Sequence, residues 1–457
     1  MSIVEEEASL PLYALKDNDR KHVWHSFAPL AGEAWMVNHA KEEYVTDIDG
    51  QRYLDAMSGL WCVNAGYGQE RIAKKVYEQM VQLSYYPMTA AHIPGAKLAK
   101  KLNEWLGAPY RIFYGNSGSE ANEAAFKIAR QYHFLKGNPT KYKIISRYRA
   151  YHGSTMGALS ATGQQQRKYG FEPMVPGFLH VHPPDPYRDF AEDHLDEYGE
   201  RLARDLERTI LWEGSETIAA MIMEPFITGG GILIPPPNYL PLVAEICRKH
   251  DILLIIDEVI NGFGRTGKNF GFQHSLVTPD MVTMAKGITS AYLPLSAVAV
   301  RPEIYEVFEA ADGEYARFRH VNTFGGHPVS CAAALENLAI FEEWNLVHRS
   351  KTMGAILLEG LNDLKTLPIV GDVRGIGLLA GIELVIDRNT REPLPAAQVA
   401  AIVGSCKTAG VIIGKNGDTV AGLNNVITVA PPLTVSEEQI ATIVDVLRSA
   451  IAANLLS

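Results

Sequence analysis

The strongest constraint on this chain is an alternation of short apolar runs with helical patterns through its middle. The runs predict strands at Arg111–Tyr114, Lys143–Arg147, Ala219–Glu224, Ile252–Asp257, Met281–Met284 and Leu295–Val300, and the helical patterns between them include Ser119–Leu135, Leu195–Leu211 and Tyr239–His250. Apolar strands that alternate with helices are typical of a mostly parallel sheet covered on both faces. We therefore predict an α/β fold whose chemistry gathers where the strands end.

The flanking segments have a different pattern. Asp49-Gly50 indicates a hairpin between Glu43–Asp49 and Gln51–Asp55. A long helix through Ala332–Glu343 precedes expected strands at Asp372–Leu384 and Val426–Ala430. Because 457 residues are too many for one simple core, we predict several packed units. These are an N-terminal segment (1–65) that joins a small α+β domain, a large domain (66–325) and the C-terminal small domain (326–457).

Composition excludes several classes of protein. The net charge of -10 argues against a nucleic-acid binder, which needs a basic patch. No apolar run reaches membrane-spanning length, and the acidic N-terminus lacks the pattern of a signal peptide. The four cysteines are scattered without metal-ligand spacing, so we expect reduced thiols, no metal site and a cytoplasmic protein.

Two charged residues stand where charges are costly to bury. Asp257 ends an apolar strand, and Lys286 lies among small and apolar residues after the next one. A carboxylate and an amine in these places suit pyridoxal phosphate (PLP), which needs an anion at its ring nitrogen and an amine at its aldehyde. Asp257-Glu258 also resembles a Walker B ending, but the GxxxxGK[ST] loop that this reading needs is missing from the sequence.

Four further positions each allow a functional and a structural interpretation. The turn Ser117-Gly118-Ser119 opens a helix and is either an anion cradle or a simple helix cap. Tyr151 can lie flat on a cofactor ring or pack in the core. His152 is either a ligand or base or a structural histidine. Glu224 ends a strand and is either functional or a capping carboxylate.

Taken together, the motifs are more specific than any of them alone. They are Asn116-Ser117-Gly118-Ser119-Glu120, Tyr151-His152-Gly153, Glu224-Pro225, Asp257-Glu258-Val259, the glycine-rich stretch 262–267, Ala285-Lys286-Gly287 and the stretch 323–328. This series resembles the class III, fold-type I PLP-dependent aminotransferases over nearly the whole chain. Residues 55–64 and 292–294 are most similar to the ω-amine:pyruvate branch, and residues 414–419 to taurine:pyruvate aminotransferases.

The resemblance implies a fold and a set of roles. The fold is a mostly parallel seven-stranded sheet flanked by helices, with a smaller α+β domain. Lys286 is expected to hold the PLP aldehyde and move a proton, and Asp257 to face the ring nitrogen. The other implied cofactor residues are Ser117, Gly118 and Ser119 at the phosphate, Tyr151 and Val259 on the ring faces, His152 and Glu224 around them, and Thr323 from a neighbouring subunit. The active unit is then a homodimer or a dimer of dimers.

The implied reaction is ping-pong transfer of an amino group from a terminal amine, such as taurine or β-alanine, to pyruvate. Phe27, Leu60, Trp61, Tyr86 and Tyr151 are expected to line the substrate pocket. Many ω-transaminases carry an arginine near residues 411–416 for the substrate carboxylate, and this chain has none there. Lys415 or Arg149 is the expected replacement, although Lys415 also fits a solvated loop lysine. The alternatives are an aminomutase, a decarboxylase, a biotin-pathway diaminopelargonate aminotransferase and a non-catalytic PLP-binding protein.

Overall fold

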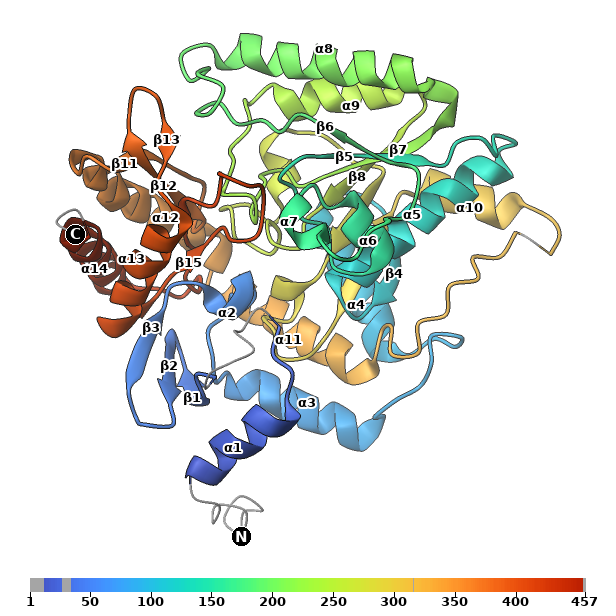
Figure 1. Ribbon diagram of the computed structural model, residues 1–457. Coiled ribbons are helices and arrows are strands. Elements are labelled where there is room, and N and C mark those ends of the chain that lie inside the picture. Colours follow the sequence, from blue (N-terminus) through green and yellow to red (C-terminus); the bar gives the residue numbers. More distant parts are fainter. Residues whose placement is uncertain (1–11, 27–33, 315, 455–457) are drawn as a thin grey trace.

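A seven-stranded sheet forms the centre of the molecule (Figure 1). The computed structural model describes residues 12–26, 34–314 and 316–454. The strand order is β4-β10-β9-β8-β7-β5-β6. The strands are β4 (Arg111–Gly115), β5 (Lys143–Arg147), β6 (Phe178–Val181), β7 (Ile218–Met223), β8 (Leu253–Asp257), β9 (Met281–Met284) and β10 (Ser296–Val300). Six of the seven strands run in the same direction, and β10 runs in the opposite direction between β4 and β9, so the predicted mostly parallel sheet is confirmed.

Both faces of this sheet are covered by helices, as the unbroken apolar strands require. Along β8, Leu253 and Ile255 belong to the core under helix α5 (Gly118–Leu135). The alternate residues Leu254 and Ile256 belong to the core shared with α8 (Leu195–Glu213) and α9 (Tyr239–Lys249). Because successive side chains of a strand point to opposite faces of the sheet, β8 packs against one helical layer on each side.

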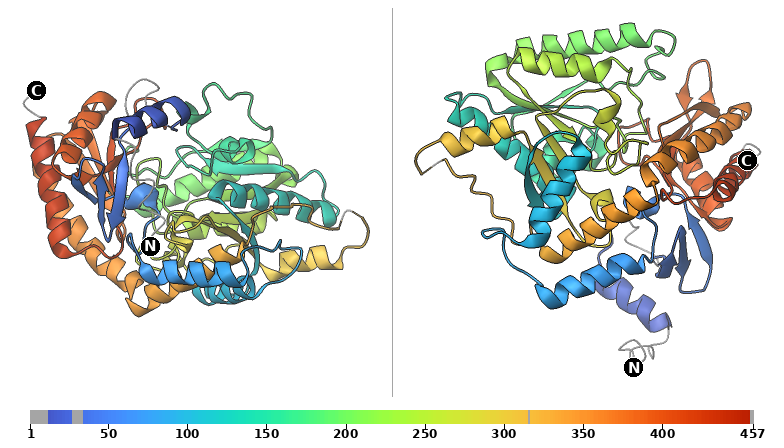
Figure 2. Two further views of the ribbon diagram at one scale, coloured as in Figure 1. Left: turned by 90° about the horizontal axis from the view of Figure 1, so that it is seen from below. Right: turned by 180° about the vertical axis from the view of Figure 1, so that it is seen from behind.

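Other helices pack around the large sheet or connect it to the rest of the chain. They are α1 (Leu12–His22), α2 (Ser58–Trp61), α3 (Glu70–Gln82), α4 (Ile93–Leu106), α6 (Met156–Ala161), α7 (Gln165–Lys168), α10 (Pro302–Ala310) and α11 (Pro328–Glu343), with short 3-10 turns at Ser215–Thr217, Gly271–His274, Lys286–Ile288 and Asp363–Thr366. Figure 2 shows α11 beside α3 and α4, against which it packs. Residues of α4 and α11 thus belong to the same hydrophobic core as one face of the large sheet.

Two smaller sheets stand beside the large one (Figure 1). The first contains β1 (Val37–Lys41), β2 (Tyr44–Asp47), β3 (Arg52–Asp55) and β14 (Val411–Ile412); the second contains β11 (Val370–Gly375), β12 (Ala380–Asp387), β13 (Glu392–Pro393), β15 (Gly414–Lys415) and β16 (Val426–Val429). Helices α12 (Leu346–Asn362), α13 (Ala396–Thr408) and α14 (Glu437–Ala453) pack with them. The parallel pairing of β3 with β14 supports our proposal that residues 1–65 join the C-terminal unit.

The structure differs from the sequence prediction at several strands, since the short strands β1, β13, β14 and β15 were not expected. β6 was not predicted, and it lies at the edge of the large sheet. The expected strand Asp372–Leu384 is a pair of antiparallel strands, β11 and β12. Gly377 turns the chain between them with a φ of +56°, and it lies close to the backbone of Arg265 and Thr266. All four cysteines are free thiols, and no helix in the described ranges is long and apolar enough to cross a membrane.

Candidate active site

The predicted site residues follow strands that end at one edge of the large sheet. Because β10 is antiparallel to both β4 and β9, β4 runs in the same direction as β9, β8, β7 and β5. Ser117 follows β4, Tyr151 follows β5, Glu224 follows β7, Asp257 ends β8 and Lys286 follows β9. All five residues therefore lie at the carboxyl-terminal edge of the strands, where open α/β sheets bind ligands.

Asp257 is a buried carboxylate that is oriented by donors from three directions. Its Oδ2 atom accepts a hydrogen bond from Asn122 Nδ2 at 2.9 Å and lies 2.9 Å from His152 Nδ1. Its Oδ1 atom accepts from the backbone N–H of Val259 at 3.0 Å. Asn122 also donates to the backbone oxygen of His152 at 2.6 Å, which fixes the pair. The sequence analysis missed Asn122, which only the packing of α5 brings to this carboxylate.

Lys286 occupies a desolvated and strained position. Burial lowers the pKa of its amine, and Arg167 acts in the same direction, while Cys62, Asp257 and Glu224 oppose the shift. Its backbone has a φ of +45°, a costly conformation for a side chain of this kind that is often found at functional sites. Within the described residues Lys286 forms no ion pair of 4.0 Å or less. A lysine with a lowered pKa is a competent nucleophile and proton carrier.

The indole of Trp61 lies beside this lysine. Lys286 Nζ is 5.2 Å from the centroid of the Trp61 ring. The buried Trp61 Nε1 atom has no hydrogen-bond acceptor among the described residues. Trp61 comes from the N-terminal segment, so a residue predicted to line the substrate pocket contacts the predicted catalytic amine.

The turn at the start of α5 combines a helix cap with a close approach of backbone segments. Ser117 Oγ accepts from the backbone N–H of Glu120 at 3.3 Å, so the simple capping interpretation is observed. A Cβ atom on Gly118 would lie 3.0 Å from Val259 Cγ2, which places Val259 directly against the turn. Ser119 Oγ accepts from the backbone N–H of Ser154 at 3.1 Å. An 18-residue helix therefore directs its N-terminus toward the segment that follows Asp257.

Tyr151 and Glu224 are joined to each other. The backbone N–H of Tyr151 donates to Glu224 Oε1 at 3.2 Å, while Thr228 donates to Oε2 through its N–H at 2.9 Å and its hydroxyl at 2.6 Å. Burial raises the pKa of Glu224 and Asp257 adds to the rise, while His152 and the Thr228 donors oppose it. Glu224 thus holds the backbone that carries Tyr151.

A second residue that the sequence analysis missed is Arg167 on α7. Its Cζ atom lies 5.1 Å from the centroid of the Tyr151 ring. Nε donates to Gln164 Oε1 at 2.6 Å, and Nη2 to the backbone oxygen of Gly417 at 3.3 Å. Burial lowers the pKa of Arg167, and Tyr151 and Asp418 oppose the shift. The guanidinium therefore lies beside the aromatic ring of the site.

Of the two cations expected to meet the substrate carboxylate, Arg149 has internal partners. It is 3% exposed, forms an ion pair with Asp185 and donates to the backbone oxygen of Gly230 from Nη2 at 2.6 Å. Because a buried carboxylate already balances its charge, the structure does not favour Arg149 as a substrate ligand. Lys415 lies on β15, and its side chain is close to Gly417. If Gly417 carried a Cβ atom, that atom would lie 3.1 Å from Lys415 Nζ.

Three other predicted residues lie at the surface of the single chain. Leu60 is 62% exposed, Tyr86 is 53% exposed, and Thr323 is also exposed. The Tyr85 hydroxyl donates to the backbone oxygen of Thr323 at 2.8 Å. Phe27 lies outside the described residues. The single chain therefore leaves the side chains of Leu60, Tyr86 and Thr323 open to solvent.

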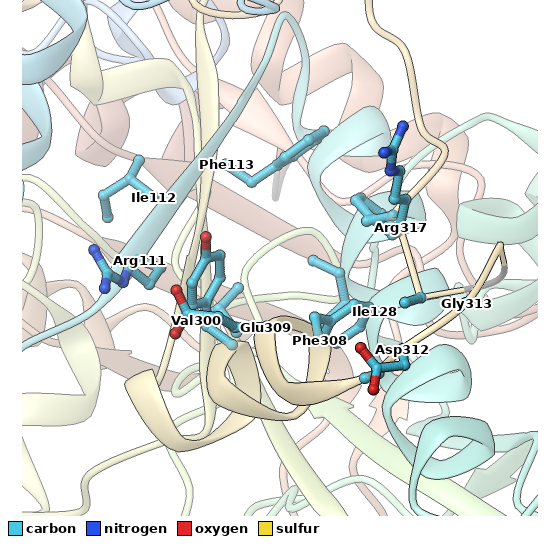
Figure 3. Close-up of a pocket in the computed structure, with 14 residues that line it drawn as sticks. Arg111, Ile112, Phe113, Ile128, Val300, Phe308, Glu309, Asp312, Gly313 and Arg317 are labelled. Carbon is cyan, nitrogen blue, oxygen red and sulfur yellow. The ribbon is translucent and has the colours of Figure 1, made fainter.

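A pocket of about 650 Å³ lies elsewhere, between β4, β10 and α10 (Figure 3). Phe113, Phe308 and Phe318 supply its apolar lining, and Arg111 and Arg317 are among its charged residues. None of the predicted cofactor or substrate residues belongs to it. The edge that carries Asp257 and Lys286 remains the candidate active site.

Comparison with known proteins identifies the family of this chain. Residues 30–451 match the family model of class-III aminotransferases. The chain is 58% identical to an uncharacterized aminotransferase of Bacillus subtilis (strain 168), with 94% of this chain and 95% of that protein aligned. It is 45% identical to a taurine–pyruvate aminotransferase of Bilophila wadsworthia (93% and 94% aligned). A crystal structure of a Bacillus anthracis aminotransferase superposes with a TM-score of 0.95 at 55% identity, covering 96% of this chain and 98% of that one.

The chain belongs to the class III aminotransferases and is a PLP-dependent enzyme. A solved ω-transaminase from Pseudomonas jessenii in complex with PMP also has this fold, with a TM-score of 0.92 at 35% identity and coverage of 97% of this chain and 98% of that chain. The groups at the site fit the cofactor chemically. A desolvated amine, a buried carboxylate oriented by donors and a helix N-terminus match its aldehyde, ring nitrogen and phosphate.

Proposed function

We propose that this enzyme transfers an amino group from a terminal amine to pyruvate in a ping-pong reaction that yields an aldehyde or ketone and L-alanine. The amine is taurine, β-alanine or a related donor. The observation that carries the proposal is the pairing of Asp257 with Asn122 and His152 opposite the desolvated Lys286. The similarity to a taurine–pyruvate aminotransferase supports the choice of donor and acceptor.

In this proposal each residue contributes a distinct physical role. PLP, when bound, withdraws electrons from the reacting carbon of the substrate. Asp257 would face the ring nitrogen, because Asn122 and His152 orient its Oδ2 atom. Ser117, Gly118 and Ser119 would bind the phosphate at the start of α5, where the helix dipole favours an anion. Tyr151 and Val259 would hold the ring, and Glu224 accepts a hydrogen bond from the backbone N–H of Tyr151.

Lys286 moves the proton at the reacting carbon. Burial lowers the pKa of its amine, so a larger fraction of Nζ is neutral and able to accept a proton near neutral pH than for a solvated lysine. The Trp61 ring, 5.2 Å away, covers this amine from one side. A covered amine exchanges its proton with the substrate instead of with bulk water.

We also propose that the working unit is a homodimer with active sites at the interface. Exposed aromatic residues surround Thr323: the rings of Tyr85 and Phe324 lie 5.9 Å apart, and they are 36% and 59% exposed. Met88, also exposed, lies against Gly326. Apolar patches of this kind mark interaction surfaces. A second copy on this surface brings Thr323 to the phosphate of its partner, and native mass spectrometry tests the assembly.

The test of the function separates the two halves of the reaction. The holoenzyme is mixed with taurine or β-alanine alone, and the absorbance of its cofactor is followed. We expect the cofactor spectrum to change with the donor and to return when pyruvate is added, with one alanine formed per site. The Lys286→Ala variant is the matched control and gives neither change.

Three outcomes contradict the proposal. Restoration of the spectrum by 2-oxoglutarate but not pyruvate moves the enzyme to another acceptor. Conversion of a biotin-pathway keto precursor, in preference to pyruvate, identifies a diaminopelargonate aminotransferase. A spectrum unchanged by a broad panel of amines leaves a non-catalytic PLP-binding protein.

A further inference from the structure

The glycine-rich stretch between β8 and β9 contains one arginine, whose guanidinium joins three parts of the chain. Arg265 is completely buried. Its Nη2 atom donates to Ser58 Oγ at 3.1 Å and to Asn64 Oδ1 at 2.7 Å, both in the N-terminal segment. Its Nη1 atom donates to the backbone oxygens of Leu378 at 3.0 Å and Pro431 at 2.5 Å, both in the C-terminal part. A planar guanidinium holds such acceptors in one fixed arrangement.

The four acceptors of Arg265 are all neutral. They are two backbone oxygens, a hydroxyl and an amide oxygen. Burial lowers the pKa of Arg265 to about 10, although Cys62 and Asp55 oppose the shift. Removing a cation from water is costly, and an apolar side chain of similar size fills the same space at a lower cost. The guanidinium therefore indicates a place where exact positions matter more than stability.

The backbone of Arg265 forms separate contacts with the C-terminal part of the chain. Its oxygen accepts from Ser350 Oγ on α12 at 3.0 Å and from the backbone N–H of Leu378 at 3.1 Å. Gly377, between β11 and β12, lies against the same backbone. These contacts fix the glycine-rich stretch without the guanidinium. What the guanidinium adds is a link from this stretch to Ser58 and Asn64.

The N-terminal segment that Arg265 contacts has a strained backbone. Ser58 has a φ of +49° and Trp61 a φ of +55°, in the left-handed region that residues with a side chain rarely adopt. Such conformations persist only where the surrounding contacts impose them. Ser58 Oγ donates to the backbone oxygen of Ala430 at 2.7 Å while it accepts from Arg265. Arg265 is thus one of the contacts that impose the turn from Ser58 to Asn64.

This turn borders Lys286 at two points. The ring of Trp61 lies with its centroid 5.2 Å from Lys286 Nζ. Asn64 lies against the next residue of the chain, because a Cβ atom on Gly287 would be only 2.7 Å from Asn64 Nδ2. The same Nδ2 atom donates to the backbone oxygen of Phe263 at 2.9 Å. The surroundings of the reactive amine therefore depend on a turn that the glycine-rich stretch holds.

We propose that Arg265 is a positioning residue for the reaction, because it holds the turn from Ser58 to Asn64 so that Trp61 covers the amine of Lys286. Arg265 acts through Trp61 and Asn64. The inference rests on the proposed role of Lys286 as the proton carrier. When the turn is released, the indole leaves the amine open to water and the amine loses its orientation toward the reacting carbon.

The first test measures access to Lys286 without any substrate. Cofactor-free protein is treated with limiting acetic anhydride, and mass spectrometry follows acetylation of Lys286, with the buried Lys141 as the internal reference. We expect Arg265→Met to acetylate Lys286 about three- to tenfold faster than the wild type, as for an opening equilibrium that loses hydrogen bonds. Trp61→Ala has a similar effect. The double variant reacts no faster than the faster single variant, because both changes act on one cover.

The second test measures turnover of the holoenzyme with taurine and pyruvate. We expect Arg265→Met to lower kcat by about 10- to 100-fold, the range for a displaced active-site group. Adding Trp61→Ala lowers kcat by no more than about twofold below the lower single variant, since the two effects are coupled. Arg265→Lys recovers part of the loss, because its one nitrogen keeps the charge but cannot span both pairs of acceptors.

Ser58→Ala and Ser350→Ala form a matched pair of variants. Both hydroxyls are buried, donate to a backbone oxygen and accept one N–H, but only Ser58 accepts from the guanidinium. We expect Ser58→Ala to change the acetylation of Lys286 and kcat in the same directions as Arg265→Met, by a smaller factor. Ser350→Ala leaves both unchanged. This pair decides the question where Arg265→Met does not fold.

Several results overturn the inference. An equal rise in the acetylation of Lys286 and Lys141 means that Arg265 only supports the fold. Effects of Arg265→Met and Trp61→Ala that multiply in the double variant show that the two residues act independently. Equal effects of Ser58→Ala and Ser350→Ala remove the guanidinium from the explanation. A wild type that does not turn over taurine, but shows the expected acetylation pattern, rejects the proposed donor and keeps the positioning role of Arg265.

Discussion

Two groups of buried charges in this molecule are built in opposite ways. The first, which we call the seam cluster, joins the large domain to the β11–β12 sheet and consists of Arg149, Asp185, Arg188, Arg374 and Glu383. The second is the pair Asp257 and Lys286. In the seam cluster every charge has an opposite charge in contact: Arg374 Nη1 lies 2.6 Å from Glu383 Oε2, Arg188 also pairs with Glu383, and Arg149 pairs with Asp185.

The pair at the active site keeps polar atoms unused within the chain. Lys286 forms no ion pair of 4.0 Å or less among the described residues. The buried His152 Nε2 and Trp61 Nε1 atoms have no hydrogen-bond partner there either. A fully paired buried cluster holds a fold together, whereas unpaired buried groups cost stability and persist where a ligand completes them. The two groups therefore differ in how completely their opposite charges pair within the chain.

Replacing Lys286 by alanine gives the largest expected effect. Turnover falls by about ten-thousand-fold or more, because both the covalent attachment and the proton transfer are lost. The thermal midpoint stays the same or rises, since a desolvated cation is removed. Single-turnover kinetics and calorimetry of wild type, Lys286→Ala and Lys168→Ala check this. A large loss of stability in Lys286→Ala alone contradicts the contrast between the two clusters.

Replacing Glu383 by glutamine is expected to lower stability and to leave turnover unchanged, the opposite of Lys286→Ala. The variant leaves Arg188 without its carboxylate and Arg374 with Asp372, 3.0 Å away, as its remaining partner. This change costs about 3 kcal/mol of the free energy of unfolding. The turnover number of the molecules that remain folded is unchanged, because Glu383 pairs with Arg374 and Arg188 and not with the reacting groups. Urea unfolding and active-site titration measure the two quantities. The exposed Glu392→Gln change is the control, and a loss below about 1 kcal/mol in Glu383→Gln speaks against the interpretation.

Replacing Asp257 by asparagine tests the second charged residue of the active-site pair. The amide keeps the shape but not the charge, so kcat falls by about 100- to 1000-fold, as when one preorganised electrostatic group is removed. Stability falls by only about 1–3 kcal/mol, since Asn122 and His152 can still donate to an amide oxygen at the position of Oδ2, while the Val259 N–H loses its acceptor at Oδ1. The measurement is kcat with saturating cofactor, beside the unfolding free energy. Equal damage to both quantities argues that Asp257 is structural.

The smallest expected effect is a dependence of stability on pH below 4.5. Burial raises the pKa of Glu383, but Arg374, Arg188 and Arg149 outweigh it and lower the pKa from 4.5 to about 2. A carboxyl with a lowered folded-state pKa stabilises the fold above its unfolded value, and the contribution is lost as the pH falls from 4.5 through about 2. Thermal midpoints of wild type between pH 5 and pH 3 decrease more steeply than those of Glu383→Gln. Parallel curves show that another group controls acid stability.

Much of this architecture is predictable because local sequence patterns carry it. Strand β8 and residue Asp257 at its end follow from an unbroken apolar run, and the motif around Lys286 follows from the contrast between one charge and its small neighbours. Strand β6 is different: Phe178–Val181 is four residues long and contains a histidine, so its pairing with β5 depends on contacts that the pattern does not reveal.

The two residues that sequence reasoning missed depend on long-range contacts. Arg167 stands in a polar four-residue helix that resembles a solvated surface, and its partner Gly417 is 250 residues away in the chain. Asn122 lies inside a helix, where an amide gives no sign that Asp257 is 135 residues away. The carboxylate of Asp185 that pairs with Arg149 also belongs to another loop, 36 residues away in the chain. Charge partners, unlike strands, are set by the tertiary fold.

The contact between α7 and the loop after β15 has a consequence for how enzymes of this kind diversify. Gly417 lies in the loop after β15 of the small sheet, while Asp257 ends β8 and Lys286 follows β9 of the large sheet. Substitutions in residues 416–424 therefore change the contacts of α7 without altering the strands that carry Asp257 and Lys286. We therefore expect laboratory selection for new amines to select substitutions in this loop and to leave Asp257 and Lys286 unchanged.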